Sequence, residues 1–113
     1  MHDNKINEDD GMSDISIVVP AHNEEKNLVE VVQGLVSNPF LKNLKKEIII
    51  VNDNSTDRTL QVAVKLAEEH KEIKIVNRSD NPSFGEALKA GIKAANGDII
   101  VSFMGDLSDD FND

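Results

Sequence analysis

The amino-acid sequence predicts an α/β fold, a Rossmann-like parallel sheet flanked by helices in the order β-α-β-α-β-α-β. Four short runs rich in β-branched residues are separated by three segments in which apolar residues recur with the period of an α-helix. Three of the four runs are nearly continuously apolar, which is typical of parallel strands covered on both faces. Strands and helices that alternate in this way form right-handed crossover units. The predicted strands span residues 15–19, 48–51, 73–76 and 99–103.

Each of the three segments between the strands carries one apolar stripe. A stripe of this kind predicts a helix that lies with one face on the sheet. The stripes consist of Leu28, Val31, Val32, Leu35 and Val36 in the first segment, Leu60, Ala63, Val64 and Ala67 in the second, and Ala87, Leu88, Gly91, Ile92 and Ala95 in the third.

Residues at the ends of these segments suit helix caps. Asn23 is expected to cap the first helix, because it is followed by two glutamates that the helix dipole favours in a first turn. Ser55 or Thr56 is expected to cap the second helix, with Asp57 following. Gly97 is expected to end the third helix just before the last strand.

Composition narrows the class of protein. The chain has 113 residues, of which 39% are apolar, and it has no cysteine. Disulfides and thiolate metal sites are therefore excluded. No apolar run approaches the roughly 20 residues that a membrane span needs, and the polar first residues do not resemble a signal peptide. These features predict a cytoplasmic protein with no transmembrane segment in this chain.

The net charge of −9 is concentrated at the two ends. Residues 1–14 carry five acids and one lysine, and residues 106–113 carry four acids and no base. The composition of residues 1–14 predicts a disordered acidic leader, and the folded domain is expected over residues 15–113. Since the part between the ends is nearly neutral and the whole is acidic, the chain is not expected to bind nucleic acid.

A polar loop follows each predicted strand. Ligands of open parallel sheets bind outside the carboxyl ends of the strands, so these loops are the candidate site. They comprise residues 20–25, 52–57, 77–82 and 104–110, and all four carry carboxylates. Carboxylate oxygens can accept from a base N–H and from ribose hydroxyls, and they bind divalent cations. The glycine-rich motifs of dinucleotide-binding and P-loop proteins are missing, which argues against both classes.

Four motifs in these loops together resemble family 2 glycosyltransferases. Residues 17–25 (IVVPAHNEE) resemble the first strand and loop of that family, and residues 50–57 (IVNDNSTD) resemble its V-D-D-G-S-T-D segment. Residues 81–91 (NPSFGEALKAG) resemble the opening of its third helix, and residues 97–108 end in a version of its M-D-A-D-L-S motif. Because the four motifs occur in the family's order over about residues 15–110, the resemblance is far more specific than any one motif.

The resemblance implies a GT-A fold, truncated here to its N-terminal, nucleotide-sugar-binding half and incomplete at its C-terminus. It also implies a nucleoside-diphosphate sugar donor and a transfer that inverts the anomeric carbon. Asp106-Leu107-Ser108 resembles the branch that uses polyprenyl (dolichol-type) phosphate as acceptor, which implies a place for the parent protein at the cytoplasmic membrane face.

Matching by position gives the residues expected to bind the donor. They are Pro20, Ala21, Glu24, Asp53, Arg78, Gly85 and Asp106. In the resembling enzymes the first three positions line the pocket for the base and ribose. Asp53 would accept from the base, and Gly85 would let the backbone approach the donor. Asp106 would face the ribose, the diphosphate or its metal.

Three positions depart from the family pattern. Asn52 replaces the first acid of an Asp-Asp pair and leaves Asp53 as the carboxylate there. His22 stands where tyrosine is common, and it is either a ring that stacks on the base or a plain loop histidine. Met104 replaces the first acid of Asp-x-Asp, so Asp106 is the expected ligand for Mg²⁺ or Mn²⁺ in the complete enzyme. One carboxylate suffices in principle, because Mg²⁺ often keeps several waters.

In the resembling enzymes the general base that activates the acceptor lies well downstream of these motifs. We therefore expect the isolated chain to bind donor without completing transfer, and no catalytic residue is assigned in it. An uncovered sheet edge after the last strand predicts self-association, because open edges pair with other copies.

Other classes of protein remain as alternatives. A sugar-nucleotide pyrophosphorylase would need a glycine-rich basic loop where residues 20–25 are acidic. A phosphorylatable receiver domain would need a lone aspartate where Asn77-Arg78 stands. The main alternative is a non-catalytic nucleotide-binding or regulatory domain derived from the transferase fold, which Met104 favours. Gly85 could also be a packing glycine rather than a donor contact.

Overall fold

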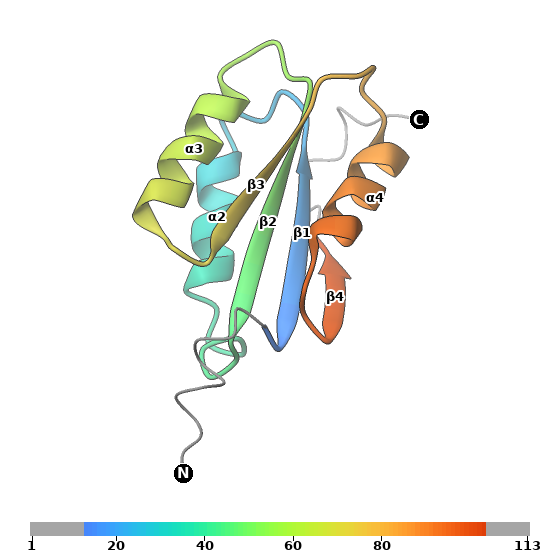
Figure 1. The fold of residues 1–113 in the computed structure, drawn as a ribbon. Coiled ribbons are helices and arrows are strands. Elements are labelled where there is room, and N and C mark those ends of the chain that lie inside the picture. Colours follow the sequence, from blue (N-terminus) through green and yellow to red (C-terminus); the bar gives the residue numbers. More distant parts are fainter. Residues whose placement is uncertain (1–12, 104–113) are drawn as a thin grey trace.

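The structure, a computed structural model, describes residues 13–103 of the chain. It confirms the predicted order of strands and helices (Figure 1). The elements are β1 (Ile15–Ala21), α2 (Leu28–Val36), β2 (Lys46–Asp53), α3 (Thr59–Glu69), β3 (Ile73–Arg78), α4 (Phe84–Ala94) and β4 (Ile99–Ser102).

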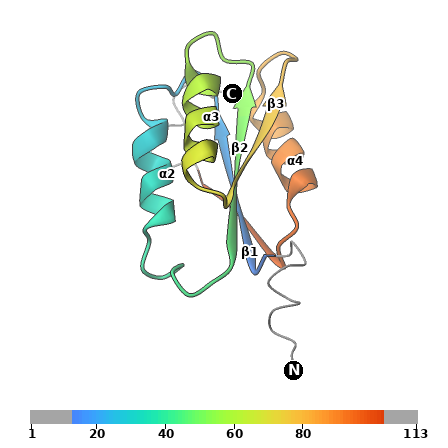
Figure 2. The ribbon, with the colours of Figure 1, turned by 60° about the vertical axis from the view of Figure 1, so that its left-hand side comes forward.

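All four strands are parallel and lie in the order β3-β2-β1-β4. Ile17 in β1 lies opposite Ile48 in β2 and Val101 in β4. The chain moves outward from β1 to β3 and then returns to the other side of β1. With right-handed crossovers, that reversal puts α4 on the opposite face of the sheet from α2 and α3, as Figure 2 shows.

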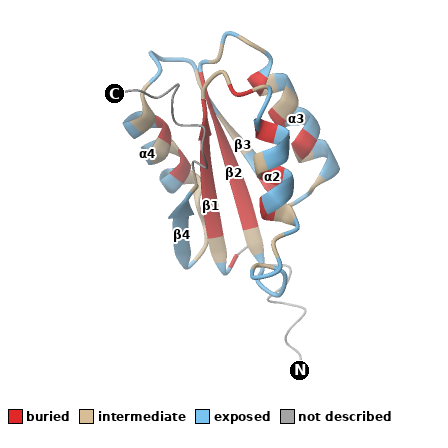
Figure 3. Ribbon diagram, turned by 180° about the vertical axis from the view of Figure 1, so that it is seen from behind, coloured by how far each residue is buried: buried red, intermediate tan, exposed pale blue. Residues whose placement is uncertain are grey.

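The core has two layers, one on each face of the sheet. Alternate residues of β1 and β2 point to opposite faces, so both strands are buried throughout their central parts (Figure 3). On one face Val19 and Ile50 pack with Leu28 and Val32 of α2. On the other face three strand residues, Val18, Ile49 and Val51, pack with Ala87 of α4. This arrangement explains why the apolar runs of β1 and β2 are continuous.

The helix starts differ from the sequence prediction. Asn23 does not cap α2, because residues 24–27 form a turn in which the N–H groups of Asn27 and Leu28 both donate to the Glu24 carbonyl, at 3.0 and 2.9 Å. Neither Ser55 nor Thr56 caps α3. Instead the carboxylate of Asp57 accepts from the Thr59 N–H at 2.9 Å.

The buried face of α3 also differs from the expected stripe. Its buried residues are Thr59, Ala63 and Leu66, while Val64 is 41% exposed. Thr59 is fully buried because its hydroxyl bonds to the loop before α2 and to Asp57. A polar residue fixes the orientation of this helix, and an apolar pattern gives no sign of it.

The connection from α4 to β4 also differs from the sequence prediction. Gly97 does not end α4, whose last residue is Ala94. A Cβ at Gly97 would lie 2.7 Å from the Ser16 hydroxyl and 2.8 Å from the backbone of β1. This glycine is therefore required by close packing against β1. β4 itself is exposed, with Ile99 at 59%, in contrast to the buried strand that its apolar run predicts.

Two residues of the expected leader, Ser13 and Asp14, lie within the described range. Ser13 is buried, and the Asp14 carboxylate accepts from the Lys45 N–H at 2.9 Å. Residues 1–12 lie outside that range. Over residues 13–103 no helix combines the length and the apolar character that a bilayer crossing requires.

Candidate functional site

The candidate site lies at the carboxyl ends of β1, β2 and β3, where the loops after the strands meet (Figure 1). The strand order reverses beside β1, and in open α/β sheets such a reversal marks the ligand-binding crevice. The fourth loop predicted at this edge begins at Met104 and lies outside the described residues.

The loops after β1 and β2 are joined through Asn23. Its side-chain carbonyl accepts from the N–H groups of Thr56, at 2.8 Å, and Asp57, at 3.3 Å. Its own N–H donates to the Ser55 hydroxyl at 3.0 Å. Asn23 has φ of 56°, a left-handed conformation that asparagine adopts more readily than most residues. The residue expected to cap a helix therefore links two loops of the site.

Asp57 strengthens the same junction. Burial by itself would raise the pKa of the Asp57 carboxyl, but hydrogen bonds from the Thr59 hydroxyl and N–H and from the Glu25 N–H outweigh burial and lower the pKa below its ordinary value. Asp57 is thus held as a carboxylate just before α3. This agrees with a structural role at the start of that helix.

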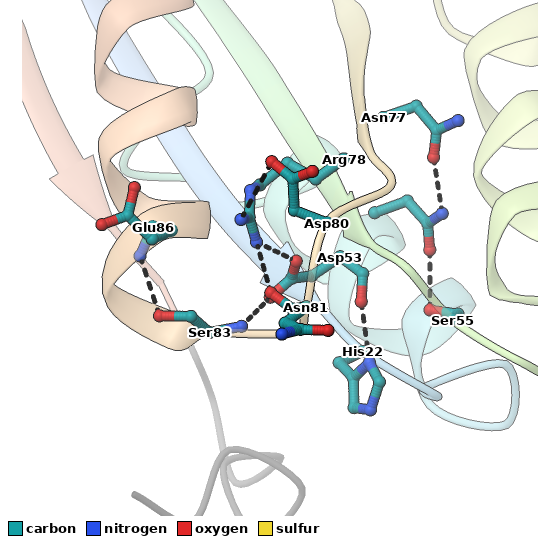
Figure 4. Close-up of polar contacts among 10 residues, drawn as sticks. His22, Asp53, Ser55, Asn77, Arg78, Asp80, Asn81, Ser83 and Glu86 are labelled. Atoms are coloured by element: carbon teal, nitrogen blue, oxygen red, sulfur yellow. Dashed lines mark hydrogen bonds and ion pairs between the residues drawn. The ribbon is translucent and has the colours of Figure 1, made fainter.

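Asp53 occupies the centre of the site (Figure 4). It is fully buried at the end of β2. One carboxylate oxygen forms an ion pair with the Arg78 guanidinium from the end of β3, and the other accepts from the Ser83 N–H at 2.8 Å. The backbone carbonyl of Asp53 lies 2.8 Å from Nδ1 of His22, at the end of β1. One residue thus connects three strand ends and the start of α4.

The contacts of Asn52 account for an asparagine where the family pattern has an aspartate. It is buried, its amide donates to the Asn77 side chain at 2.7 Å, and its carbonyl accepts from the Ser55 hydroxyl at 2.7 Å. An aspartate would offer no donor in this place. The amide therefore completes a polar ladder across β2 and β3 that lies beside Asp53 (Figure 4).

The structure brings most of the predicted donor-binding residues to one edge, with different exposure. Pro20, Ala21, Glu24 and Asp53 are buried, the Arg78 side chain is 13% exposed, and Gly85 is exposed. A Cβ at Gly85 would meet only the Ser83 hydroxyl, at 4.0 Å, so packing does not require a glycine there. By contrast, a Cβ at Gly91 would overlap Val18 and lie 3.0 Å from Val51. Asp106 lies outside the described residues.

Ser83 was not among the predicted site residues. Its N–H holds Asp53, and its hydroxyl accepts from the Glu86 N–H and caps α4. The sequence does carry a signal for the cap, since Ser83 and Glu86 have the S-x-x-E spacing of a capping box. It carries none for the contact with Asp53, which lies thirty positions earlier in the chain.

The described residues do not offer a metal site. Within residues 13–103 there is no cluster of three or more His, Cys, Asp or Glu side chains that could hold a metal ion. Asp53, the central carboxylate, is already bound by a guanidinium and an N–H. These residues therefore do not fit a metal by themselves.

Comparison with known proteins identifies the family. The model of the family described as glycosyl transferase family 2 matches residues 16–112, which is most of the chain. The chain belongs to glycosyl transferase family 2. The match runs through all four motifs of the candidate site, so the motifs and the family model agree.

Two relatives of this family 2 chain are named for dolichyl or dolichol phosphate. A dolichyl-phosphate beta-glucosyltransferase of Trichomonas vaginalis is 34% identical over 94 residues, covering 77% of this chain and 28% of that protein. A dolichol-phosphate mannosyltransferase of Pyrococcus furiosus is 32% identical over 93 residues, covering 82% of this chain and 26% of that protein. The chain thus spans less than a third of the length of these relatives.

Solved structures share the fold. A mannosyltransferase from Pyrobaculum calidifontis, solved with GDP-Man and Mn²⁺, matches with a TM-score of 0.69 at 22% identity, over 80% of this chain and 27% of that one. S. aureus TarS, solved with UDP-GlcNAc, matches with a TM-score of 0.63 at 29% identity, over 78% of this chain and 26% of that one. The predicted GT-A architecture is confirmed.

Proposed function

We propose that this chain is the nucleotide-sugar-binding part of an inverting glycosyltransferase. The observation that carries the proposal is the junction at Asp53, which joins three strand ends and the start of α4 at the ligand-binding edge of the sheet. Family membership and the likeness to TarS, whose structure holds UDP-GlcNAc, support the same class of donor.

The proposed donor site comprises Pro20, Ala21, Glu24, Asp53, Arg78, Gly85 and Asp106. The buried residues at the end of β1 form the floor beneath the base and ribose. Gly85 leaves the backbone open at the start of α4. An anionic diphosphate is favoured there, because N–H groups and the helix dipole attract negative charge.

A divalent cation, Mg²⁺ or Mn²⁺, is proposed to depend on Asp106 in the complete enzyme. The cation would neutralise the diphosphate as it leaves. The residues around Asp53 are proposed to bind and orient the nucleotide.

The acceptor is proposed to be a polyprenyl phosphate, and the parent protein to act at the cytoplasmic face of a membrane. Two dolichol-phosphate-type relatives support this class of acceptor. We propose that the 113-residue chain binds donor but does not complete transfer, because the resembling enzymes supply the base from a region downstream of these motifs.

Titration calorimetry of the 113-residue chain with UDP, GDP and CDP, each with and without Mn²⁺, tests the proposal. At least one of the three should bind with a Kd below about 1 mM. The variant Lys65→Gln, on the exposed side of α3, should bind equally well. Binding of none of the three would overturn donor binding and favour a non-catalytic domain of the same fold, the alternative suggested by Met104. Turnover with a nucleotide sugar and a polyprenyl phosphate would overturn the proposed inactivity.

A further inference from the structure

Arg78 is the basic residue at the centre of the candidate site, and its charge is already engaged. Its guanidinium pairs with the fully buried carboxylate of Asp53 and is itself only 13% exposed. The same guanidinium donates to the Asn81 carbonyl at 3.4 Å, and it lies 4.0 Å from the exposed carboxylate of Asp80 (Figure 4). Each of these three partners of Arg78 is a group of the protein at the sheet edge.

These contacts close the loop between β3 and α4. The loop leaves β3 at Arg78 and reaches α4 at Ser83, and both ends bind the carboxylate of Asp53. The Asn81 carbonyl, midway along the loop, is tied to the same guanidinium. The loop is thus folded onto Asp53 by one side chain.

The pairing also stabilises the buried carboxylate of Asp53. A buried carboxylate without a partner is costly. The Arg78 charge, together with the Ser83 N–H, satisfies Asp53 inside the protein. Loss of Arg78 would leave the buried carboxylate of Asp53 without its charged partner.

We infer that Arg78 is a positioning residue, which acts on the donor through Asp53 and the loop of residues 79–83 and does not bind the diphosphate. This inference rests on the proposed function, since it assumes that a nucleotide binds at this edge. It predicts that the nucleoside part of the donor, and not its phosphates, is sensitive to Arg78.

The test compares nucleoside and nucleotide binding in Arg78→Gln. Affinities for uridine and UDP, and in parallel for guanosine and GDP, are measured by calorimetry. The variant should lose about tenfold or more in affinity, by the same factor for the nucleoside as for its diphosphate. A phosphate contact would lower affinity for the diphosphate and leave the nucleoside unchanged, and that result would overturn the inference.

Hydrogen exchange gives a second readout that does not need a ligand. Exchange at the N–H groups of residues 79–83 should become faster in Arg78→Gln, since the loop loses the contact that closes it. Unchanged exchange there would contradict the inference even if affinity fell. If the wild-type chain binds no nucleotide at all, the proposed function fails, while the exchange result still decides the role of Arg78 in the loop.

Two further variants complete the design. Lys89→Gln removes the same charge from an exposed residue of α4 that pairs with Glu86 on the same helix, and it should leave affinity and exchange unchanged. Arg78→Lys keeps the charge beside Asp53, so it is the variant to measure if Arg78→Gln does not fold. A lysine lacks the planar fork that reaches two acceptors. We therefore expect a smaller, equal loss for nucleoside and diphosphate, and a loss confined to the diphosphate would again overturn the inference.

Discussion

At the scale of single residues, Glu47 is the clearest buried charge outside the candidate site. Its carboxylate accepts from the Ser16 hydroxyl at 2.5 Å and from the Asn96 N–H at 2.7 Å, and it lies 2.9 Å from the Lys74 ammonium. Burial by itself would raise the pKa of Glu47, but these bonds and the Lys74 charge outweigh burial and lower the pKa. One carboxylate thus ties β1, β2 and β3 to the end of α4 at the edge opposite the site.

The lowered pKa of Glu47 predicts a pH-dependent stability. A carboxyl whose pKa is lower in the folded state stabilises the protein above its unfolded pKa, about 4.3 for glutamate, and loses that contribution as the pH falls. Glu47→Gln should lower the free energy of unfolding by about 1–3 kcal/mol near pH 7, with a smaller difference near pH 3. Urea unfolding at several pH values measures this. Glu68→Gln, on the exposed side of α3, is the control, and an equal difference at both pH values would contradict the assignment.

Two helical glycines predict opposite effects of the same substitution. A Cβ at Gly91 would overlap Val18 beneath α4, whereas nothing lies within 4 Å of a Cβ at Gly34 in α2. Gly91→Ala should lower the free energy of unfolding by about 1–3 kcal/mol through overpacking. Gly34→Ala should raise it by up to about 1 kcal/mol, because alanine favours the helix. Thermal unfolding of the two variants beside the wild type checks both signs.

At the scale of elements, the loops after β1 and β2 behave as one unit. Besides the Asn23 contacts, the Glu24 N–H donates to the Thr59 hydroxyl at 2.8 Å, and the Arg58 N–H donates to the Glu25 carboxylate at 3.1 Å. These bonds replace the separate helix caps that the sequence predicts for α2 and α3. The starts of both helices are therefore fixed by the same junction.

The junction predicts a graded response at Asn23. Asn23→Gly loses the side-chain acceptor but keeps the left-handed backbone, so the free energy of unfolding should fall by about 1–2 kcal/mol. Asn23→Ala also strains the backbone at φ of 56°, so its free energy of unfolding should be lower by about a further 1 kcal/mol. Urea denaturation gives both values. Equal stability of the alanine and glycine variants would show that backbone conformation contributes little there.

At the scale of the whole molecule, the sheet has an exposed edge at β4. β1 and β2 are buried, while β4 lies at an edge with its apolar side chains exposed (Figure 3). Exposed, apolar edge strands pair readily with other chains. Self-association of the 113-residue chain through β4 therefore remains our prediction.

A lysine on β4 tests that prediction. Ile99→Lys should reduce concentration-dependent association in sedimentation velocity, because a charge on an edge strand opposes pairing. Leu44→Lys places the same charge on another exposed apolar residue, 41% exposed in the loop before β2, and should leave association unchanged. A wild-type chain that stays monomeric at high concentration would contradict the prediction.

The fold and part of the site were predictable from the sequence. Continuous β-branched runs and helical periodicity are local patterns, so they correctly gave four parallel strands and three helices. The motifs at the strand ends placed Asp53 and Arg78 at one edge of the sheet. A strand end is determined by neighbouring residues, and parallel topology then brings such ends together.

The partners of these residues depend on tertiary structure. Ser83 reaches Asp53, Asn23 binds the loop after β2, and Gly97 packs against β1, each across at least thirty positions of sequence. The inner face of α3 includes Thr59, outside the expected stripe, and Thr59 likewise bonds to a distant residue, Glu24. The sequence alone therefore determined the order of elements, the family and the edge that carries the candidate site. Only the tertiary structure decided which groups satisfy the buried polar atoms, because hydrogen bonds between distant segments leave no periodic pattern in the chain.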